Sequence, residues 1–465
     1  MAERITIAGA GLVGSLLAGY LAKRGYEVAV YEKRPDRRKH FQDAGRSINL
    51  ACSTRGWRAL DGVGVGDAVR REAIPMRGRI LHDLEGQTSF QPYGTGDQAI
   101  YSVSRGGLNE ILMDHAESLG AKFHFDMACE DVDLKNGKAT FVNYHSKERH
   151  EVESRVIFGA DGAFSKVRAV MQRMPHFDYS QDYIESDYKE LTIPADHNGK
   201  YALEKEALHI WPRGKYMLIA LPNPDKSFTC TLFMPYQGKE SFEDFTDDET
   251  TLEFFKRVFP DATEKMPTLI QDFHENPQAP LVIIRSYPWH FNDRVCLIGD
   301  ACHAIVPFYG QGMNSGFEDV FVLDGMIDKY EGDWSKILPA FTAERKPDGD
   351  AIADLALYNY RVMADSVNDE GFMLRKRLEH RIMELYPDRY RSLYSMVTFS
   401  HIRYSEAQKR GFEQDAFFER LIQEYDVESM FEDGSVDEFI HGLFERSEMP
   451  EGFDLKRVPA EEAEG

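Results

Sequence analysis

The hydrophobic pattern changes period twice within residues 4–34. An apolar run, "ITIAGAG", ends in a glycine-rich turn. Leu16, Leu17, Tyr20 and Leu21 then recur at the spacing of one helix face, and alternating apolar positions return in "EVAVYEK". Strand, glycine turn, helix and strand in this order predict one βαβ unit.

Similar changes of period continue along the chain. Residues 54–65 and 106–120 carry apolar side chains at helical spacing, and a C-cap-like glycine ends the second stretch. Alternation in 121–145 predicts half-buried strands, and the apolar run at 155–159 predicts a fully buried one. From 177 to 291, strand-like runs separated by Pro and Gly predict an antiparallel sheet.

The last third of the chain is predicted to be mostly helical. A buried strand at 294–298 is followed by a helix beginning near Ser315, and nearly everything after Trp334 has helical spacing. The polar, acidic stretch 450–465 is expected to fray. The predicted fold class is α/β, with a Rossmann-like domain, an inserted antiparallel β-sheet substrate domain and a helical C-terminal region. The predicted parts are 1–176 and 292–333 for the first domain, 177–291 for the second and 334–465 for the third.

Charge and cysteine content narrow the function classes. Lys and Arg number 55 against 78 Asp and Glu, a net charge of -23, which disfavours nucleic acid or an anionic membrane as a partner. Five cysteines without C-x-x-C spacing indicate neither a disulfide framework nor a zinc ribbon, and they fit a reducing cytosol. No secretory signal or membrane span is expected, and the charged amphipathic segment after Tyr404 is expected to pack over the substrate domain. The expected location is cytoplasmic.

The first glycine turn has the form G-x-G-x-x-G, at Gly9, Gly11 and Gly14, with Glu32 at the end of the next strand. Such glycines let a pyrophosphate approach the helix N-terminus, and the acid accepts hydrogen bonds from a ribose. Between a strand and a helix, the pattern predicts dinucleotide binding without separating NAD from FAD. The alternative is tight strand-to-helix packing alone.

Two further motifs occur downstream. "GADGAFSKVR" has the form D-G-x-x-S-x-x-R, and "GDACHAIVPFYGQGMN" has the form G-D-x-x-H-x-x-x-P-x-x-G-Q-G-x-N. With the glycine fingerprint they resemble the signature set of the group A flavoprotein aromatic hydroxylases, the para-hydroxybenzoate hydroxylase-like family. The resemblance implies bound FAD, with Asp300 on its ribityl chain and with Asp161 and Arg168 framing the turn shared by the pyrophosphate and the nicotinamide donor.

The second of these motifs also has a physical interpretation. Gly310, Gly312, Met313 and Asn314 open a helix, so free N–H groups and the positive end of the helix dipole face whatever binds there. A reduced flavin, negative at N1 and C2=O, suits that end. The alternative is an ordinary glycine-rich helix start.

Other stretches from Ile5 to about Ala407, among them "SFTCTLFMP" and "MVTFSHIRY", resemble the kynurenine-hydroxylating members of this family. The resemblance implies that Arg79, Tyr93, Asn359 and Tyr394 bind the amino-acid end of L-kynurenine. A carboxylate buried beside a flavin is costly without a guanidinium to pair with it. From the residues alone, Arg79 could equally be a surface residue like Arg77, and the other three could be ordinary core or interface polar residues.

The remaining site predictions concern the ring wall and the cofactor. Phe233, Phe308 and Pro307 are expected to wall the aromatic ring, since ligand pockets are mostly apolar. By motif position, the resemblance implies further FAD contacts at Val13, Tyr31, Lys33, Arg34, Ala51, Arg105, Cys129, Met313 and Asn314. No metal site is expected, because His303 has no second His or carboxylate at ligand spacing on its face.

As the resemblance implies, NADPH reduces FAD, O2 is taken up, and a C4a-hydroperoxyflavin hydroxylates L-kynurenine at position 3. The ring amine already activates that position, so no side chain is expected to act as a catalytic base. With one fingerprint only, NADPH is expected to bind at the surface of the assembled domains. The alternatives are a hydroxylase of another electron-rich aromatic acid and a non-catalytic flavin-binding relative. The sequence does not set an oligomeric state.

Overall fold

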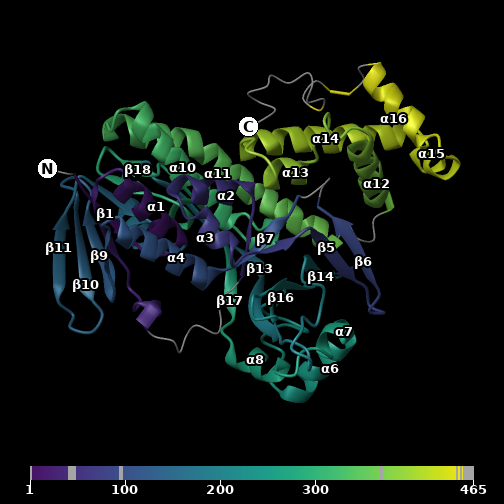
Figure 1. The fold of residues 1–465 in the computed structure, drawn as a ribbon, viewed down its shortest axis with the longest axis horizontal. Helices are drawn as coiled ribbons and strands as arrows, with labels where there is room; N and C mark the ends of the chain where they lie inside the picture. Colours follow the sequence, from purple (N-terminus) through teal and green to yellow (C-terminus); the bar gives the residue numbers. More distant parts are fainter. Residues whose placement is uncertain are drawn as a thin grey trace.

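The computed structural model of the chain describes residues 3–39, 49–93, 98–365, 370–446, 449–450 and 453. Figure 1 shows one α/β part around β1, a second part with α6, α7 and α8 at its base, and the C-terminal helices beside both. This arrangement confirms the predicted fold class.

A six-stranded sheet forms the centre of the first part, in the order β18-β19-β12-β1-β2-β8. Every neighbouring pair is parallel except β18 with β19. β12 is buried along its whole length, as its apolar run predicts. The strands are β1 (Arg4–Ala8), β2 (Glu27–Tyr31), β8 (Lys122–His124), β12 (Val156–Gly159), β18 (His290–Phe291) and β19 (Val295–Leu297).

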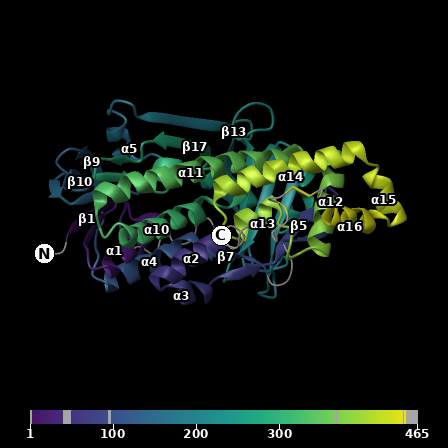
Figure 2. The same cartoon turned by 90° about the horizontal axis from the view of Figure 1, so that it is seen from above.

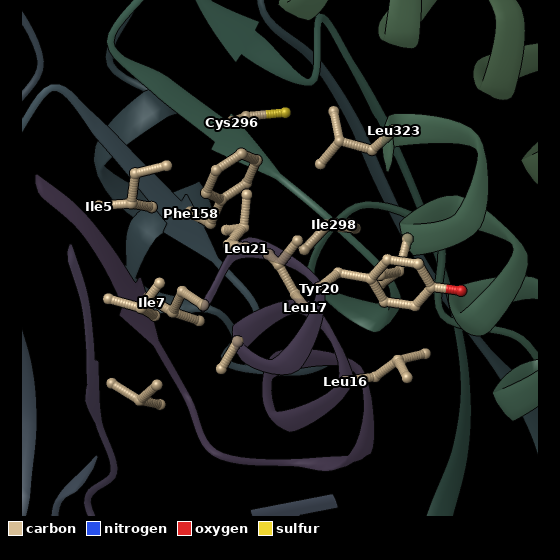
Figure 3. Close-up of a cluster of buried hydrophobic side chains, with 14 of the residues drawn as sticks. Ile5, Ile7, Leu16, Leu17, Tyr20, Leu21, Phe158, Cys296, Ile298 and Leu323 are labelled. Carbon is tan, nitrogen blue, oxygen red and sulfur yellow. The ribbon is translucent and has the colours of Figure 1, made fainter. Parts of the chain in front are cut away.

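Helices cover this sheet and share its core. Figure 3 shows Leu21 of α1 beside Phe158 of β12, and Leu17 beside Ile298, which directly follows β19. The helical elements of this part are α1 (Leu12–Lys23), η1 (Arg37–Lys39), α2 (Thr54–Val63), α3 (Gly66–Arg70), α4 (Arg105–Ser118), α5 (Lys166–Met171), α9 (Asp300–His303), η3 (Pro307–Tyr309) and α10 (Gly312–Lys329). α10 begins three residues before the predicted start at Ser315, because Gly312 already has helical geometry.

Two three-stranded sheets flank the central one, in the orders β11-β10-β9 and β3-β7-β4. All their pairs are antiparallel. Their strands are β3 (Asn49–Cys52), β4 (Ile74–Met76), β7 (Ile100–Ser104), β9 (Met127–Asp133), β10 (Lys138–Asn143) and β11 (Arg149–Glu153).

The second part is a seven-stranded sheet in the order β17-β13-β16-β15-β14-β5-β6. Its strand pairs are antiparallel except β14 with β5. The sheet includes two strands, β5 and β6, from outside the predicted segment 177–291. One face packs on an aromatic core under α6, α7 and α8. The elements are β5 (Gly78–His82), β6 (Thr88–Pro92), β13 (Asp178–Ile193), β14 (Ala207–Arg213), β15 (Tyr216–Pro222), β16 (Phe228–Pro235), β17 (Ala279–Tyr287), α6 (Asp248–Val258), α7 (Pro260–Thr263) and α8 (Leu269–Glu275).

The C-terminal region is helical, as predicted. Figure 2 shows α11 and α14 running side by side, and α11 also packs on α10. α14 packs on α11, α12 and α13, so the expectation that it covers the substrate domain is corrected: its apolar face meets other C-terminal helices. The helices are α11 (Trp334–Asp365), α12 (Glu370–Leu385), α13 (Leu393–Thr398), α14 (Tyr404–Glu424), α15 (Val427–Asp433) and α16 (Val436–Glu445).

Within the described ranges, no helix combines the length and the apolar character needed to cross a bilayer. Most of the stretch predicted to fray, 454–465, lies outside the described residues.

Candidate active site

A cavity of about 370 Å³ lies between the seven-stranded sheet and the segment that runs from η3 into α10. Its lining combines residues predicted for the cofactor with residues predicted for the substrate. From the first set it has Val13, Ala51, Arg105, Asp300, Gly312 and Met313, and from the second Arg79, Tyr93, Phe233, Pro307, Phe308, Asn359 and Tyr394. One cavity therefore joins all seven substrate candidates to the predicted flavin turns.

The floor of the cavity is one face of the seven-stranded sheet. Because successive side chains of a strand point to opposite faces, alternate positions line it. In β15 these are Met217, Ile219 and Leu221, while Leu218 and Ala220 belong to the aromatic core on the other side. The register places Arg79 opposite Leu208, which also lines the cavity.

Arg79 is the cationic group of this floor. Its side chain is half-buried, its guanidinium carbon lies 5.9 Å from the Tyr394 ring centroid, and within the described ranges it has no ion pair with an Asp or Glu. Arg77 is exposed instead, and its Nε lies 3.2 Å from Glu206 Oε2. The two arginines, which the sequence does not distinguish, thus have different surroundings.

Three tyrosines form a stack beside Arg79. The ring centroids of Tyr93 and Tyr394 lie 5.3 Å apart, and those of Tyr394 and Tyr309 lie 5.7 Å apart. Burial raises the pKa of all three phenols. The Tyr93 hydroxyl is buried without a hydrogen-bond partner of acceptable geometry in the part of the chain that the structure describes. All three hydroxyls are protonated at neutral pH and can serve a ligand as donors.

Asn359 and the two predicted phenylalanines complete the substrate end. Asn359 Nδ2 donates to Phe308 O at 2.7 Å, so this amide fixes η3 against α11. The rings of Phe233 and Phe308 lie 4.9 Å apart, and Pro307 begins η3. This wall is apolar, as an aromatic ligand requires.

The three glycines of the turn between β1 and α1 have different surroundings. A Cβ on Gly9, whose φ is +102°, would lie 2.4 Å from Ala160 O, and one on Gly14 would lie 2.1 Å from Gly9 O. A Cβ on Gly11 would meet no atom within 4 Å. Gly9 and Gly14 therefore permit close backbone packing, while Gly11 leaves the N-terminus of α1 open to a ligand.

Glu32 lies beside this turn and is almost fully buried. Its carboxylate accepts hydrogen bonds from Ala10 N at 2.9 Å and from Arg34 Nε at 2.8 Å. Burial alone would raise the pKa of Glu32, but Arg34 and the backbone N–H groups outweigh burial and lower it. The ionised group has lone pairs left for a ribose hydroxyl. Lys33 is exposed.

The N-terminus of α10 opens on the cavity at Gly312 and Met313. The N–H groups of its first turn have no helical acceptor, since the first helical bond runs from Ser315 N to Gln311 O at 2.8 Å. The Asn314 side chain points elsewhere: its Nδ2 donates to Ala51 O at 2.8 Å, and its Oδ1 accepts from Ser53 N at 2.9 Å. Asn314 therefore braces β3 against α10, and only its backbone faces the open end.

Asp300 and Asp161 have different surroundings. Asp300 lines the cavity, and burial raises its pKa although Arg105 opposes the shift. Asp161 caps α5 by accepting from Ser165 Oγ at 2.5 Å and Lys166 N at 2.6 Å. Arg168 is buried, and its Nη1 donates to Ala301 O at 2.8 Å. Asp161 and Arg168 therefore fix the turn after β12 and tie it to α9.

Tyr31 and Cys129, both predicted to contact the cofactor, lie where β2 meets β9 and do not line the cavity. The Tyr31 ring stacks on Phe141 with centroids 4.0 Å apart, and Phe141 pairs with Cys129 in the sheet register. Burial raises the pKa of Cys129 to about 12, so its thiol is protonated and apolar at neutral pH. The roles of Tyr31 and Cys129 stay predictions.

His303 has a carboxylate neighbour from another helix, which residue spacing along its own face does not reveal. Asp319, sixteen residues later on α10, places Oδ2 2.5 Å from His303 Nε2, and Arg345 Nε lies 2.8 Å from Asp319 Oδ1. Cys302, His303 and Asp319 could together offer three metal-ligand atoms within 4.8 Å of one another. Both carboxylate oxygens already have partners, and the cluster is charge-compensated by a guanidinium.

Several lining residues were missed by the sequence analysis. Tyr309 lies within the quoted glycine motif, and Met217, Ile219 and Leu221 carry the alternation of a predicted strand. Alternation was the available signal for these three, but it does not say which face of a sheet meets a ligand.

The residues at these turns fit FAD. Gly11 leaves open space at the N-terminus of α1. The first N–H groups of α10, which have no helical acceptor, suit a group that carries negative charge. Between them, Val13 packs over Gly299 and Gly316 at the cavity wall.

Comparisons with known proteins agree with this geometry. A sequence profile for the FAD binding domain family matches residues 3–356. Among solved structures, a 2-methyl-3-hydroxypyridine-5-carboxylic acid oxygenase superposes with a TM-score of 0.64 at 20% identity, over 78% of this chain and 93% of that one. PqsL of P. aeruginosa gives 0.66 at 19% identity, over 80% and 100%. The family profile and the fold thus define an FAD-binding flavoprotein, as the three motifs predict.

Curated relatives define the family more narrowly. A kynurenine 3-monooxygenase of Flavobacterium johnsoniae is 48% identical over 95% of this chain and 99% of its own length. One of Sus scrofa is 46% identical over 87% of this chain and 86% of its own length. The chain belongs to the kynurenine 3-monooxygenase family.

Proposed function

We propose that the chain catalyses the FAD-dependent 3-hydroxylation of L-kynurenine, with NADPH as the reductant. The observation that carries the proposal is Arg79, a guanidinium in an apolar cavity without a carboxylate partner in the described residues. In a protein of net charge -23, such a cation suits an anionic ligand.

The substrate end of the cavity matches the two ends of L-kynurenine. Arg79 pairs with the carboxylate, and the hydroxyls of Tyr93 and Tyr394 donate to it. Asn359 holds η3, so that Phe308 and Phe233 enclose the aminobenzoyl ring. This arrangement orients the ring toward the flavin turns and excludes water.

Bound FAD supplies the electron transfer and the activation of oxygen. Overall, L-kynurenine, NADPH, H⁺ and O2 give 3-hydroxy-L-kynurenine, NADP⁺ and water. One oxygen atom enters the ring and the other is reduced to water with the electrons of NADPH. The first N–H groups of α10 have no helical acceptor, and together with the helix dipole they favour negative charge on a group bound at this end.

No side chain of the cavity is assigned as a base. Burial raises the pKa of Tyr93, Tyr309 and Tyr394, so none of them is a phenolate at neutral pH. The ortho amine of the substrate activates position 3 itself, and the chain contributes orientation and exclusion of water.

The proposal includes NADPH as the electron donor, bound at the surface of the assembled domains. It also includes cofactor contacts for Lys33, Tyr31 and Cys129, and a cytoplasmic location. The five cysteines are free thiols, and four of them are buried, which fits a reducing compartment.

The test is turnover of the purified, FAD-loaded protein with NADPH. We expect L-kynurenine to accelerate NADPH oxidation and to yield a product heavier by one oxygen atom, hydroxylated at position 3. Salicylate and 4-hydroxybenzoate serve as comparison substrates. Faster coupled hydroxylation of either one would indicate a hydroxylase of another aromatic acid, and no turnover with any aromatic would indicate a non-catalytic flavoprotein.

A further inference from the structure

Arg55 of α2 is fully buried at the meeting point of α2, α10 and α13. Its Nε donates to Val397 O at 3.1 Å, and its Nη2 donates to Ile402 O. Its Nη1 donates to Glu318 Oε1 at 2.6 Å. One guanidinium therefore contacts both the C-terminal end of α13 and the middle of α10.

The contact with α13 bears on the substrate site. The last carbonyls of a helix have no helical donor, and a cation near them is favourable. Arg55 supplies that donor and that charge to α13, which carries Tyr394 at its N-terminal end. Because α13 is a single short helix, a shift of its C-terminal end moves Tyr394 as well.

The contact with α10 bears on the flavin end. The Arg55 guanidinium carbon lies 4.0 Å from the Tyr404 ring centroid, and Tyr404 Oη donates to Gln311 Oε1 at 2.9 Å. Gln311 directly precedes the first turn of α10, where Gly312 lines the cavity. Glu318, the acidic partner of Arg55, lies two turns further along the same helix.

We propose that Arg55 is a positioning residue that couples the substrate helix α13 to the flavin-facing helix α10. It sets the position of Tyr394 relative to the α10 N-terminus, and thereby the alignment of substrate with flavin. This inference rests on the proposed function, and nothing in it requires Arg55 to touch either ligand.

The test variant is Arg55→Lys, which keeps the charge beside Glu318 but lacks the fork that reaches several acceptors at once. The matched control is Arg58→Met on the same helix. Arg58 Nη2 lies 3.0 Å from Glu318 Oε1, and Arg58 has no hydrogen bond to α13 in the described residues. In both variants Glu318 keeps Arg345, whose Nη1 lies 2.9 Å from Oε2.

Three measurements on FAD-loaded protein carry the test: the Kd for L-kynurenine from flavin absorbance, H2O2 formed per NADPH oxidised, and amide exchange of α13. For Arg55→Lys we expect about a tenfold rise in Kd, within the ~5- to 150-fold range of couplings between sites. We also expect a higher H2O2 fraction, with the electrons of NADPH reducing O2 instead of supporting hydroxylation, and faster exchange in α13. Arg58→Met should match wild type in all three.

The proposal would be overturned if Arg55→Lys had the Kd and the H2O2 fraction of wild type, even with a lowered melting temperature. The role of Arg55 would then be structural only. Equal effects of Arg58→Met would also overturn it. If Arg55→Lys does not fold, Tyr404→Phe, which keeps the ring and removes the bond to Gln311, must raise the H2O2 fraction for the proposal to stand. Failure of wild type to hydroxylate L-kynurenine would instead contradict the proposed function.

Discussion

At the scale of single residues, the three glycines of the fingerprint divide into two kinds. A side chain at Gly9 or Gly14 would clash with backbone, whereas one at Gly11 would enter open space at the α1 N-terminus. Gly11 has φ -70° and ψ -179°, which any residue adopts. The fold therefore needs Gly9 and Gly14, and we propose that ligand binding needs Gly11.

We accordingly expect Gly11→Val to fold with a melting temperature near that of the wild-type apoprotein and to lose FAD. The valine side chain would occupy the open space at the N-terminus of α1 that a bound pyrophosphate needs. Gly14→Ala should instead lower the melting temperature or abolish folding. The measurements are flavin absorbance of the purified protein and its thermal melt; a yellow, flavin-replete Gly11→Val protein would contradict the assignment.

Residue chemistry accounts for much of what the sequence could predict here. The choice of Arg79 follows from the need to pair a buried carboxylate. Its distinction from Arg77 is a tertiary fact, because Arg77 precedes β5 and pairs with Glu206, whereas Arg79 lies within β5 and lines the cavity. Asp319 was missed as a partner of His303, because the two lie sixteen residues apart on different helices and meet only after α10 packs on α9.

At the scale of elements, α10 combines an open N-terminus with a buried network of charges. Asp319 contacts His303 and Arg345, and Glu318 contacts Arg55 and Arg345. Burial alone would lower the pKa of His303, but the Asp319 carboxylate outweighs it and raises the pKa. For Asp319, His303 and Arg345 outweigh burial and lower the pKa.

We expect Asp319→Asn to lower the free energy of unfolding by about 3–5 kcal/mol, because it removes the charged partner of buried His303 and one of the carboxylates that pair with Arg345. The interaction with protonated His303 is complete below the usual histidine pKa of about 6.5 and is lost as the pH rises through the raised pKa of His303. The stability difference between wild type and Asp319→Asn should therefore be largest between about pH 5 and 6.5 and shrink at higher pH, without vanishing while Arg345 remains. Denaturant unfolding from pH 5 to 9 measures it; a difference that grows with pH would refute the charged pair.

Element types were largely predictable, while pairings were not. Apolar periodicity identified the βαβ unit and the buried strand β12. It could not show that β5 pairs in parallel with β14. These strands are more than a hundred residues apart, and the hydrophobic pattern of a strand does not indicate which strand it pairs with.

At the scale of the whole molecule, the cavity is assembled from segments that are distant in the sequence. β3, β5, β15, the segment from η3 to α10, and α13 each supply lining residues, although they are distant in sequence. A ligand in this cavity therefore stabilises several regions at once.

Amide hydrogen exchange should show this directly. Saturating L-kynurenine should slow exchange together in β5, β15, the start of α10 and α13, because binding adds about 2.7 kcal/mol of stability at a hundredfold excess over Kd. The β9–β11 sheet and α15–α16, which do not line the cavity, serve as internal controls. Protection confined to the first α/β part would contradict a shared cavity.

The most direct test of the central claim, that Arg79 pairs with the substrate carboxylate in the shared cavity, compares two ligands and two variants. The Kd values of L-kynurenine and of 2-aminoacetophenone, which lacks the amino-acid end, are measured with FAD-loaded wild type, Arg79→Met and the control Arg77→Met. We expect Arg79→Met to weaken the binding of L-kynurenine by about 30- to 5000-fold, the equivalent of roughly 2–5 kcal/mol for a lost buried charge pair, and to change the Kd of 2-aminoacetophenone little. Arg77→Met should match wild type for both ligands. An equal loss for the two ligands, or none for L-kynurenine, would contradict the account.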